Sequence, residues 1–356
     1  MPPHPRKKAA AVQAPVVTAA TMQDVARALG LSTSTVSLAL SGRRSLPEVT
    51  RRRVVEKAEE MGYRKNPLVT ALMETRRRGR PAAAGTVIAF LDFHADADDL
   101  RRATQPDYYP GCAAEAERMG LRLERFFVLD PAMPARRLCS ILHARGIHGV
   151  ILGACAIPGY VPDFDWAKFC WTSMTVSIDA PPLDLVNTDH FGDIHSSLLQ
   201  ARRLGYRRAA LALRRVADER LRRAWLGAYL AHVEDVNADG ALEPYREDEW
   251  TAASFHRWLK TVKPDVIIGP IAAKKLRVIE EAATPLAKKP AVISVAVPQD
   301  DDRITGFREN WPVMEIEAVR HLAGQLMRNE TGLPRVPRLL RIPGTWNPGR
   351  TALPRV

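Results

Sequence analysis

The chain has 356 residues, 46% of them hydrophobic and 26% charged, so it is too long for one ordinary domain and can bury more than one core. No stretch approaches the roughly 18 consecutive apolar residues that a membrane span needs, and the basic, proline-interrupted start is unlike a secretory signal. We therefore expect a cytoplasmic protein, whose four cysteines, without CxxC spacing, are small buried residues in a reducing compartment.

Almost all of the formal charge of +12 lies at one end of the chain. Residues 1–80 hold 16 Lys and Arg against 6 Asp and Glu, a net charge of +10, whereas the other 276 residues hold 36 against 34. A basic end on a nearly neutral body is typical of a polyanion-binding module attached to a second module. We expect residues 1–20 to be a disordered basic tail, because the first patterned segment begins after them.

Three short helices are predicted within residues 21–66. Thr21 can cap the first helix, which Gly30 ends, and Ser32 can cap the second. Pro47 opens the third, where its missing N–H costs little. Apolar residues recur at helical spacing in each segment, and the tight glycine turn between the first two helices predicts a helix-turn-helix.

The second helix has the composition of a helix that reads DNA bases. Its exposed positions carry side chains small enough to let the backbone approach the major groove, and the Thr and Ser hydroxyls can meet donors or acceptors on base edges. Arginines on the flanks can hold phosphates. An ordinary three-helix bundle with a solvated basic face is the alternative. The residues concerned are Thr33, Ser34, Ser37 and Leu38 on the helix, and Arg43, Arg44, Arg51 and Arg64 on the flanks.

Residues 21–72 resemble the DNA-binding head of the lactose/galactose repressor (LacI/GalR) family of bacterial regulators. The matching residues are Thr21, Asp24-Val25-Ala26, Gly30, Thr35-Val36-Ser37, Thr50-Arg51, Gly62-Tyr63, Asn66 and Leu72. The family usually has Arg where this chain has Leu38, which cannot make the bidentate contact with guanine, so we expect a different operator. The resemblance implies DNA contacts by Thr21, Met22, Ser32, Thr33, Ser34, Ser37, Leu38, Arg43, Arg44, Ser45, Thr50, Arg51, Tyr63, Asn66 and Leu72.

Residues 67–84 are expected to form a hinge helix and a basic linker. By the same resemblance, residues 67–74 become helical only on DNA and pair with the copy from a second subunit, while Leu72 wedges into the minor groove. Val69-Thr70 replaces the family's usual Ala-Arg pair. In the free protein a flexible linker is equally compatible, because so short a helix does not persist alone. Two heads on a near-palindromic site imply a homodimer.

From residue 85 onward, apolar strand runs alternate with helical stretches, which predicts an α/β fold with parallel sheets. Its length suits two doubly wound lobes with a ligand crevice, residues 85–185 with 305–328 and 186–304 with 329–346, followed by a tail at 347–356. No dinucleotide or triphosphate motif occurs, so we expect no cofactor. Expected strands are 86–92, 121–128, 149–153, 175–179, 209–213, 266–269 and 291–295, with helices such as 109–119 and 191–204.

This body resembles the effector-binding domain of the same family, which is built like periplasmic sugar-binding proteins. The resemblance is clearest at residues 186–206, 264–268 and 304–346. It implies effector contacts by Asp179, Arg222, Trp250, Glu309 and Trp311. A strand-end turn acid and core aromatic residues are the alternative interpretation for Asp179, Trp250 and Trp311.

Several positions depart from the family's sugar clamp. Pro270-Ile271 stands where the family has Asn-Asp, and Pro298 stands where it has Asp. The usual pocket arginine is out of register, with Leu221 between Arg220 and Arg222. These losses favour a ligand other than a typical sugar, or no ligand. Because Arg222 could bind a negative charge, an anionic effector remains an alternative.

An enzyme is not expected, because the sequence has no GxSxG elbow, no HExxH and no metal-spaced His/Cys cluster, and its nine histidines are scattered. Asp96, Asp98 and Asp99 lack EF-hand spacing and suit a solvated turn. We expect a nucleoid-associated transcriptional regulator, a repressor by family default, that binds operator DNA as a homodimer under control of a small-molecule effector. An activator, or a DNA-binding protein without an effector, is the alternative.

Overall fold

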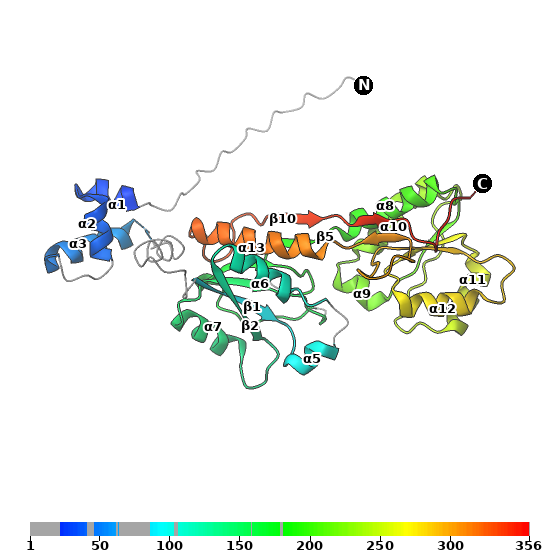
Figure 1. Cartoon of the computed structure of the whole chain (residues 1–356), viewed down its shortest axis with the longest axis horizontal. Helices are drawn as coiled ribbons and strands as arrows, with labels where there is room; N and C mark the ends of the chain where they lie inside the picture. The colour runs from blue at the N-terminus through cyan, green and yellow to red at the C-terminus, as the bar shows by residue number, and fades with distance from the viewer. Residues whose placement is uncertain are drawn as a thin grey trace, which may run out of the picture. The chain divides into compact units, whose positions relative to one another are not determined.

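The computed structural model describes residues 22–40, 46–61, 63, 86–102, 106–157, 159–178 and 181–355. The chain divides into two compact units, Met1–Thr70 and Ala71–Val356, called here the head and the body (Figure 1). The expected basic tail and hinge helix lie outside the described residues. Among the described helices, none combines the length and the apolar character needed to cross a membrane.

The head consists of α1 (Met22–Leu29), α2 (Thr33–Leu40) and α3 (Glu48–Glu60). Gly30 has a φ of +65°, the left-handed conformation that ends α1 and allows the tight turn into α2. One valine and one alanine from each helix are buried at the centre, so the three helices pack closely: Val25, Ala26, Val36, Ala39, Val54 and Ala58. The predicted helix-turn-helix is confirmed.

The first lobe of the body is built on a six-stranded sheet in the order β10-β5-β4-β3-β1-β2, and its strand pairs are all parallel. The strands are β1 (Thr86–Asp92), β2 (Leu121–Phe127), β3 (Gly149–Leu152), β4 (Cys170–Ser173), β5 (Asp184–Thr188) and β10 (Leu339–Ile342). Its helices are α5 (Ala97–Arg102), α6 (Tyr109–Arg118), α7 (Ala135–Ala144), the 3₁₀ turn η1 (Trp166–Lys168) and α13 (Trp311–Met327).

The second lobe holds a five-stranded sheet in the order β11-β9-β8-β7-β6, parallel except for the antiparallel pair β11–β9. Its strands are β6 (Ala209–Leu211), β7 (Val266–Gly269), β8 (Ala291–Ser294), β9 (Gly306–Arg308) and β11 (Thr345–Asn347). Its helices are α8 (His190–Arg203), α9 (Arg215–Arg220), α10 (Ala224–His232), the 3₁₀ turn η2 (Val233–Asp235), α11 (Ala252–Val262) and α12 (Ala273–Ala283). The predicted two-lobed α/β architecture is confirmed.

The chain passes between the lobes three times, after β5, after β9 and after β10. Several details differ from the sequence assignment. Residues 186–188, placed in the second lobe, belong to β5 of the first, and the expected tail packs on the second lobe, where Ala352 is buried. Strand β9, placed with residues 305–328 in the first lobe, pairs with β8 of the second, and β10, placed with residues 329–346 in the second lobe, pairs with β5 of the first. Strands of three or four residues carry too little periodicity to be assigned from the sequence.

The strands expected at 86–92 and 266–269 have the observed bounds, but the one expected at 175–179 is wrong. The strand in this part of the chain is β4, which ends earlier, at Ser173. The described residues after it make only an isolated bridge at Ile178. The Ser173 hydroxyl accepts from Thr175 N at 3.2 Å and donates to Thr175 O at 2.8 Å, and Thr175 Oγ1 accepts from Ser177 N at 3.1 Å. These local bonds take backbone groups that a sheet ladder would need.

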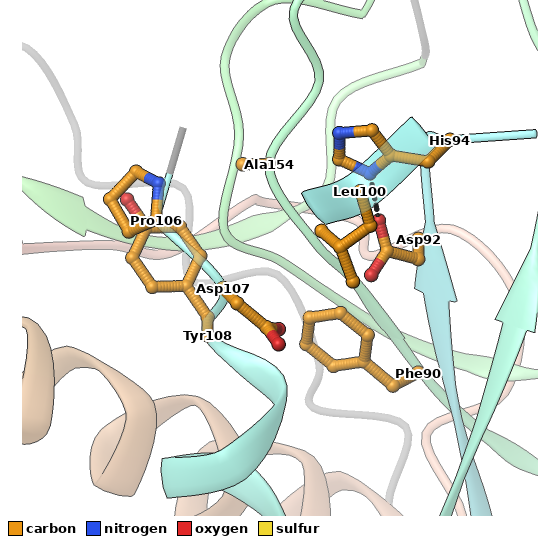
Figure 2. Close-up of a pocket in the computed structure, with 8 residues that line it drawn as sticks. All are labelled: Phe90, Asp92, His94, Leu100, Pro106, Asp107, Tyr108 and Ala154. Atoms are coloured by element: carbon orange, nitrogen blue, oxygen red, sulfur yellow. Dashed lines mark hydrogen bonds and ion pairs between the residues drawn. The ribbon is translucent and has the colours of Figure 1, made fainter. Parts of the chain in front are cut away.

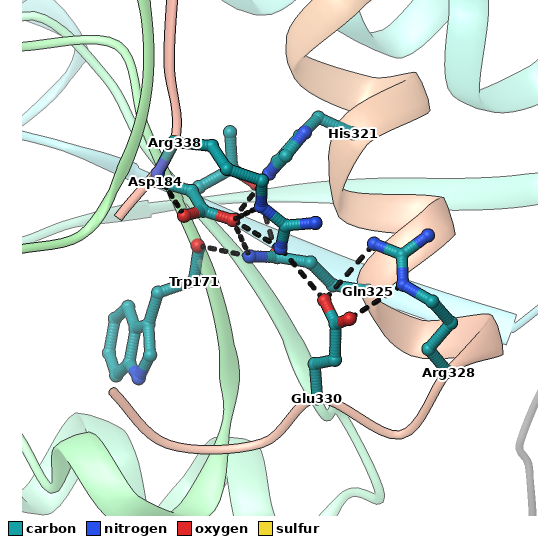
Figure 3. Close-up of polar contacts among 8 residues, drawn as sticks. Trp171, Asp184, His321, Gln325, Arg328, Glu330 and Arg338 are labelled. Carbon is teal, nitrogen blue, oxygen red and sulfur yellow. Dashed lines mark hydrogen bonds and ion pairs between the residues drawn. The ribbon is translucent and has the colours of Figure 1, made fainter. Parts of the chain in front are cut away.

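A buried carboxylate ties the return segment before β10 to the first sheet (Figure 3). Asp184, fully buried at the start of β5, accepts from Arg338 N at 2.8 Å, Gln325 Nε2 at 3.0 Å and His321 Nε2 at 2.7 Å. Burial alone would raise the pKa of Asp184, but hydrogen bonds from Arg338 and His321 outweigh it and hold that pKa below its ordinary value. Arg338 also pairs with Glu330, so the network fixes where α13 ends and β10 begins.

Candidate DNA-binding surface and effector site

Helix α2 presents its predicted contact residues on one side and the head's core residues on the other. Ser32 Oγ accepts from Thr35 N at 3.1 Å and so caps the helix. Thr33 and Ser34 are exposed, whereas Val36 is fully buried. Leu38 is half-buried but lies outside the described side chains that pack on the head's core. The Leu38 side chain can therefore contact a molecule that binds over α2.

Other predicted contact residues have roles inside the head. Met22 and Tyr63 pack against the core, and burial raises the pKa of the Tyr63 phenol. Arg51 forms an ion pair with Glu48, which raises the pKa of the guanidinium, and Thr50 is half-buried beside it at the start of α3. A phosphate contact by Arg51 would therefore replace an existing ion pair. Thr21, Arg43, Arg44, Ser45, Asn66 and Leu72 lie outside the described residues.

In the body, two predicted effector residues meet where the chain leaves β9 for α13. Trp311 Nε1 donates to Glu309 Oε2 at 2.8 Å, and the Trp311 ring meets the Tyr108 ring edge-on with centroids 6.2 Å apart. His190, at the start of α8, brings Nδ1 within 3.8 Å of Glu309 Oε1. Arg220 at the end of α9 donates to the carbonyl of Cys155, 3.4 Å away in the first lobe. We call Tyr108, His190, Arg220, Glu309 and Trp311 the interlobe cluster.

Burial in the interlobe cluster favours the neutral forms of its acid and its imidazole. Burial raises the pKa of Glu309 to about 7, helped by the neighbouring Asp193, although the bond from Trp311 opposes the rise. Burial lowers the pKa of His190 to about 4, and the charge of Arg220 acts in the same direction. A neutral carboxylic acid can donate a hydrogen bond as well as accept one. The cluster therefore combines aromatic faces with both donors and acceptors.

The remaining predicted effector residues do not join this cluster. Arg222 is exposed, with a φ of +56°, in the turn after α9, whereas Arg220, two residues earlier, lies in the cluster. Leu221 between them is buried in the second lobe, so the helix turns Arg222 outward. Trp250 packs on Tyr245 and Phe255. Asp179 lies outside the described residues.

Trp250 has a cationic neighbour that sequence reasoning missed. Lys275 Nζ lies 5.0 Å from the centre of the Trp250 ring and donates to the carbonyl of Pro270 at 2.7 Å. Burial lowers the pKa of Lys275 to about 8, and the charge of Arg214 adds to this. Trp250 is thus a partly buried aromatic residue with a polar edge, consistent with either a packing role or a ligand contact.

The positions that depart from the family's polar clamp are apolar in the structure as well. Ile271 follows β7 and is fully buried against α11 and α12 residues. Its N–H donates to Ser294 Oγ at 3.2 Å, so the backbone is satisfied without a ligand. Val297, next to Pro298, is also buried. No amide or carboxylate side chain at these two positions can hold a hydroxyl group.

Figure 2 shows a pocket of the first lobe that borders the interlobe cluster at Tyr108. A close contact between Asp92 and His94 closes one side of it. The space holds about one water molecule, so this pocket is too small for a sugar. The lining residues are Phe90, Asp92, His94, Leu100, Pro106, Asp107, Tyr108 and Ala154.

Comparisons with known proteins agree with both parts of the structure. Residues 21–66 match the family model "Bacterial regulatory proteins, lacI family". A relative, the maltose regulon regulatory protein MalI of Escherichia coli (strain K12), is 30% identical over 139 residues. That match spans 38% of this chain and only 36% of the relative.

Solved structures extend the likeness over the whole fold. The lac repressor dimer bound to operator and the anti-inducer ONPF superposes with a TM-score of 0.52 at 15% identity, over 94% of this chain and 99% of that one. The transcriptional regulator CelR in its cellobiose complex gives a TM-score of 0.51 at 17% identity, over 92% of this chain and 98% of that one. At such identities the likeness establishes the fold.

Proposed function

We propose that this chain, a member of the lacI family of bacterial regulatory proteins, is a sequence-specific transcriptional regulator that binds a near-palindromic operator as a homodimer. It acts in the cytoplasm in association with the nucleoid. Each head lays α2 in the major groove, and the paired hinge segments 67–74 of two subunits bend the DNA between the half-sites. The family consists of transcriptional regulators, not enzymes, and we assign no catalytic residue.

One observation supports this function most strongly. The segment that matches the lacI model folds into three helices whose second helix exposes Thr33 and Ser34 while Val36 packs inward. Small hydroxyl side chains on an exposed, capped helix suit base-edge contacts. Leu38, on the same side, can meet the methyl group of a thymine, and replaces the arginine that would select guanine.

We propose that a small molecule bound between the lobes controls DNA binding. The interlobe cluster would contact it through Trp311, Glu309 and Arg220, and a change in the relative orientation of the lobes would alter pairing of the hinge segments 67–74. Two compared proteins are named for a maltose regulon and a cellobiose complex, which makes a sugar the first candidate. The buried Ile271 weighs against a typical sugar clamp, so an effector-independent regulator is the second candidate.

The proposed sign of regulation is repression by occlusion of the promoter, with activation as the alternative. Deletion of the gene should raise the output of a reporter placed behind the selected operator. A fall in reporter output would show an activator instead.

The DNA-binding function is tested by selecting bound duplexes from a random pool with the full chain. We expect a near-palindromic consensus. Ser34→Glu, which places a carboxylate on exposed α2 without touching the head's core, should abolish the enrichment. Ser140→Glu, the same change on an exposed residue of α7, is the matched control and should leave the consensus intact. Enrichment of no sequence by the unmodified chain would contradict the proposal.

A further inference from the structure

The second lobe gathers three metal-ligand side chains that the regulator function does not use. His195 lies on α8, His232 ends α10, and Asp235 lies in η2. Their ligand atoms all lie within 4.8 Å of one another. We propose that these residues form a binding site for a divalent transition metal of the zinc class, with two imidazoles and one carboxylate as protein ligands.

Helix packing holds the two imidazoles together. Helices α8 and α10 pack side by side on the second sheet (Figure 1). Phe191 and His195 are one turn apart on α8, and both rings contact His232: Phe191 edge-on at 5.7 Å and His195 stacked at 3.9 Å between centroids. Buried Trp225 and Tyr229 fix α10 beneath them. The histidine pair is therefore set by the core of the lobe and not by a chance meeting of flexible surface chains.

The carboxylate is also anchored. Asp235 lies between Val233 and Val236, which are both buried in the core of the second lobe. Asn237 then fastens the segment to β6, because its Oδ1 accepts from Ala209 N at 2.7 Å and its Nδ2 donates to Ala209 O at 2.9 Å. In this arrangement Asp235 Oδ2 lies 3.9 Å from His232 Nδ1.

The distances suit a metal once one ring reorients, because the two imidazoles are stacked with their planes 20° apart and an ion must lie in the plane of each ring it binds. Zinc binds imidazole nitrogen at about 2.0–2.1 Å in tetrahedral geometry, so two ligand atoms on one ion lie about 3.4 Å apart. The three ligand atoms need to approach by about 1.4 Å at most from their separations of up to 4.8 Å. His195 and His232 are half-buried and Asp235 is exposed, so the rings can turn and water can fill the fourth position.

The local charge also favours a cation. The Asp235 carboxylate is half-exposed, and among the described ion-pair contacts its partner is the His232 imidazole, which is charged only when it is protonated. A bound metal ion would replace this pair and neutralise the carboxylate, while two neutral imidazoles donate their lone pairs. The ion would cross-link α8 to η2. Because the site exists only in the folded lobe, metal at 100 times its dissociation constant should raise the melting temperature of the body by about 5–10 °C.

The test uses the full chain without an affinity tag, stripped by a chelator and titrated with Zn²⁺ against a chromophoric competitor. We expect one equivalent per chain to bind with a dissociation constant below about 10 μM, and Co²⁺ to give the visible absorption of a tetrahedral nitrogen–oxygen site. His195→Asn and His232→Asn should each weaken binding at least tenfold, and Asp235→Asn should weaken it less.

The chain offers a matched control. His143 and His148 form an edge-on pair with ring centroids 6.0 Å apart, but no described carboxylate joins them in a three-ligand cluster. His143→Asn should leave Zn²⁺ affinity and the Co²⁺ spectrum unchanged. Three results would each overturn the site. They are unchanged Zn²⁺ affinity in His195→Asn and His232→Asn, an equal loss of affinity in His143→Asn, and no binding by the unmodified chain at 100 times the expected dissociation constant. Variants are compared only where their near-ultraviolet circular dichroism matches that of the unmodified chain. The Co²⁺ spectrum of the unmodified chain also tests the site without any substitution.

Discussion

The head and the body are stabilised by cores of different kinds. Among its described residues, the head fully buries valine and alanine alone, two from each helix, with larger side chains only partly buried around them. The body buries large side chains, among them Trp171, Phe169 and Tyr229, and a fully buried carboxylate with its partners. Small side chains let three short helices approach closely, but they remove little apolar surface from water. One destabilising core substitution should therefore unfold the head, whereas the body should remain folded after such a substitution.

The largest expected effect tests the weakness of the head. Val54→Asp places an unpaired carboxylate at a fully buried position of α3, and this penalty of several kcal/mol exceeds what so small a domain can absorb. Specific DNA binding, measured by fluorescence anisotropy on the selected operator, should be lost. The thermal unfolding of the body should not change. Val161→Asp, at a body position that is 68% exposed, is the control and should affect neither measurement.

The second prediction tests the body through its buried network. Asp184→Ala leaves Arg338, Gln325 and His321 without their shared acceptor, and should cost about 3 kcal/mol of unfolding free energy. The melting temperature of the body should fall by about 5–10 °C while the head still binds DNA at room temperature. Asp163→Ala, which removes an exposed ion pair with Arg136, should cost less than about 1 kcal/mol. Equal effects of the two substitutions would contradict a structural role for the network.

The head could be predicted in detail because its signals are local. Caps, glycine turns and apolar spacing all act within a few residues, so the sequence places α1, α2 and α3 within a residue or two. In the body, long apolar strands such as β1 were also predictable. β5 was not, because its buried residues include Asp184 and Asn187: Asp184 accepts from Arg338, far away in the sequence, and Asn187 donates to the carbonyl of Met174 after β4. A buried polar residue looks like a loop residue until its partner is known.

The candidate sites show the same limit. Glu309 and Trp311 were predicted, but His190 and Tyr108 were not, because the four residues come from different elements that meet only in the folded body. For the arginine, the sequence could not tell on which side of Leu221 the functional residue lies; the structure places Arg220 in the interlobe cluster and Arg222 in solvent. Spacing along a sequence does not report such long-range assembly.

The third prediction uses pH to probe the interlobe cluster. The pKa of Glu309 is raised from 4.5 to about 7, so between these pH values the folded chain holds a proton that the unfolded chain has released. The stability from this group is complete below pH 4.5 and is lost as the pH rises through about 7. Asp193, raised to about 7, acts with the same sign, whereas His190, lowered to about 4, destabilises the fold as the pH falls below 6.5.

Comparison with Glu309→Gln tests this carboxyl together with its interaction with Asp193, because the other groups remain in both chains. The difference in unfolding free energy between the two chains should shift by up to about 3 kcal/mol in favour of the Gln variant as the pH rises from 4.5 to 7. Denaturant unfolding at several pH values measures it. A difference that does not depend on pH would mean that Glu309 stays ionised in the folded body.

The smallest expected effect concerns Arg51, where the head's own electrostatics oppose DNA binding. Arg51 pairs with Glu48 in the free head, so contact with a phosphate exchanges one anion for another. Arg51→Ala should weaken binding to operator and to random DNA by the same modest factor and reduce the salt dependence by about one ion per head. Glu48→Gln removes the competing anion while it leaves Arg51 in place, and should strengthen binding slightly to both DNAs. Anisotropy titrations at several salt concentrations distinguish these opposite signs. If both substitutions weaken binding equally, the ion pair positions Arg51 for the phosphate instead of competing with it.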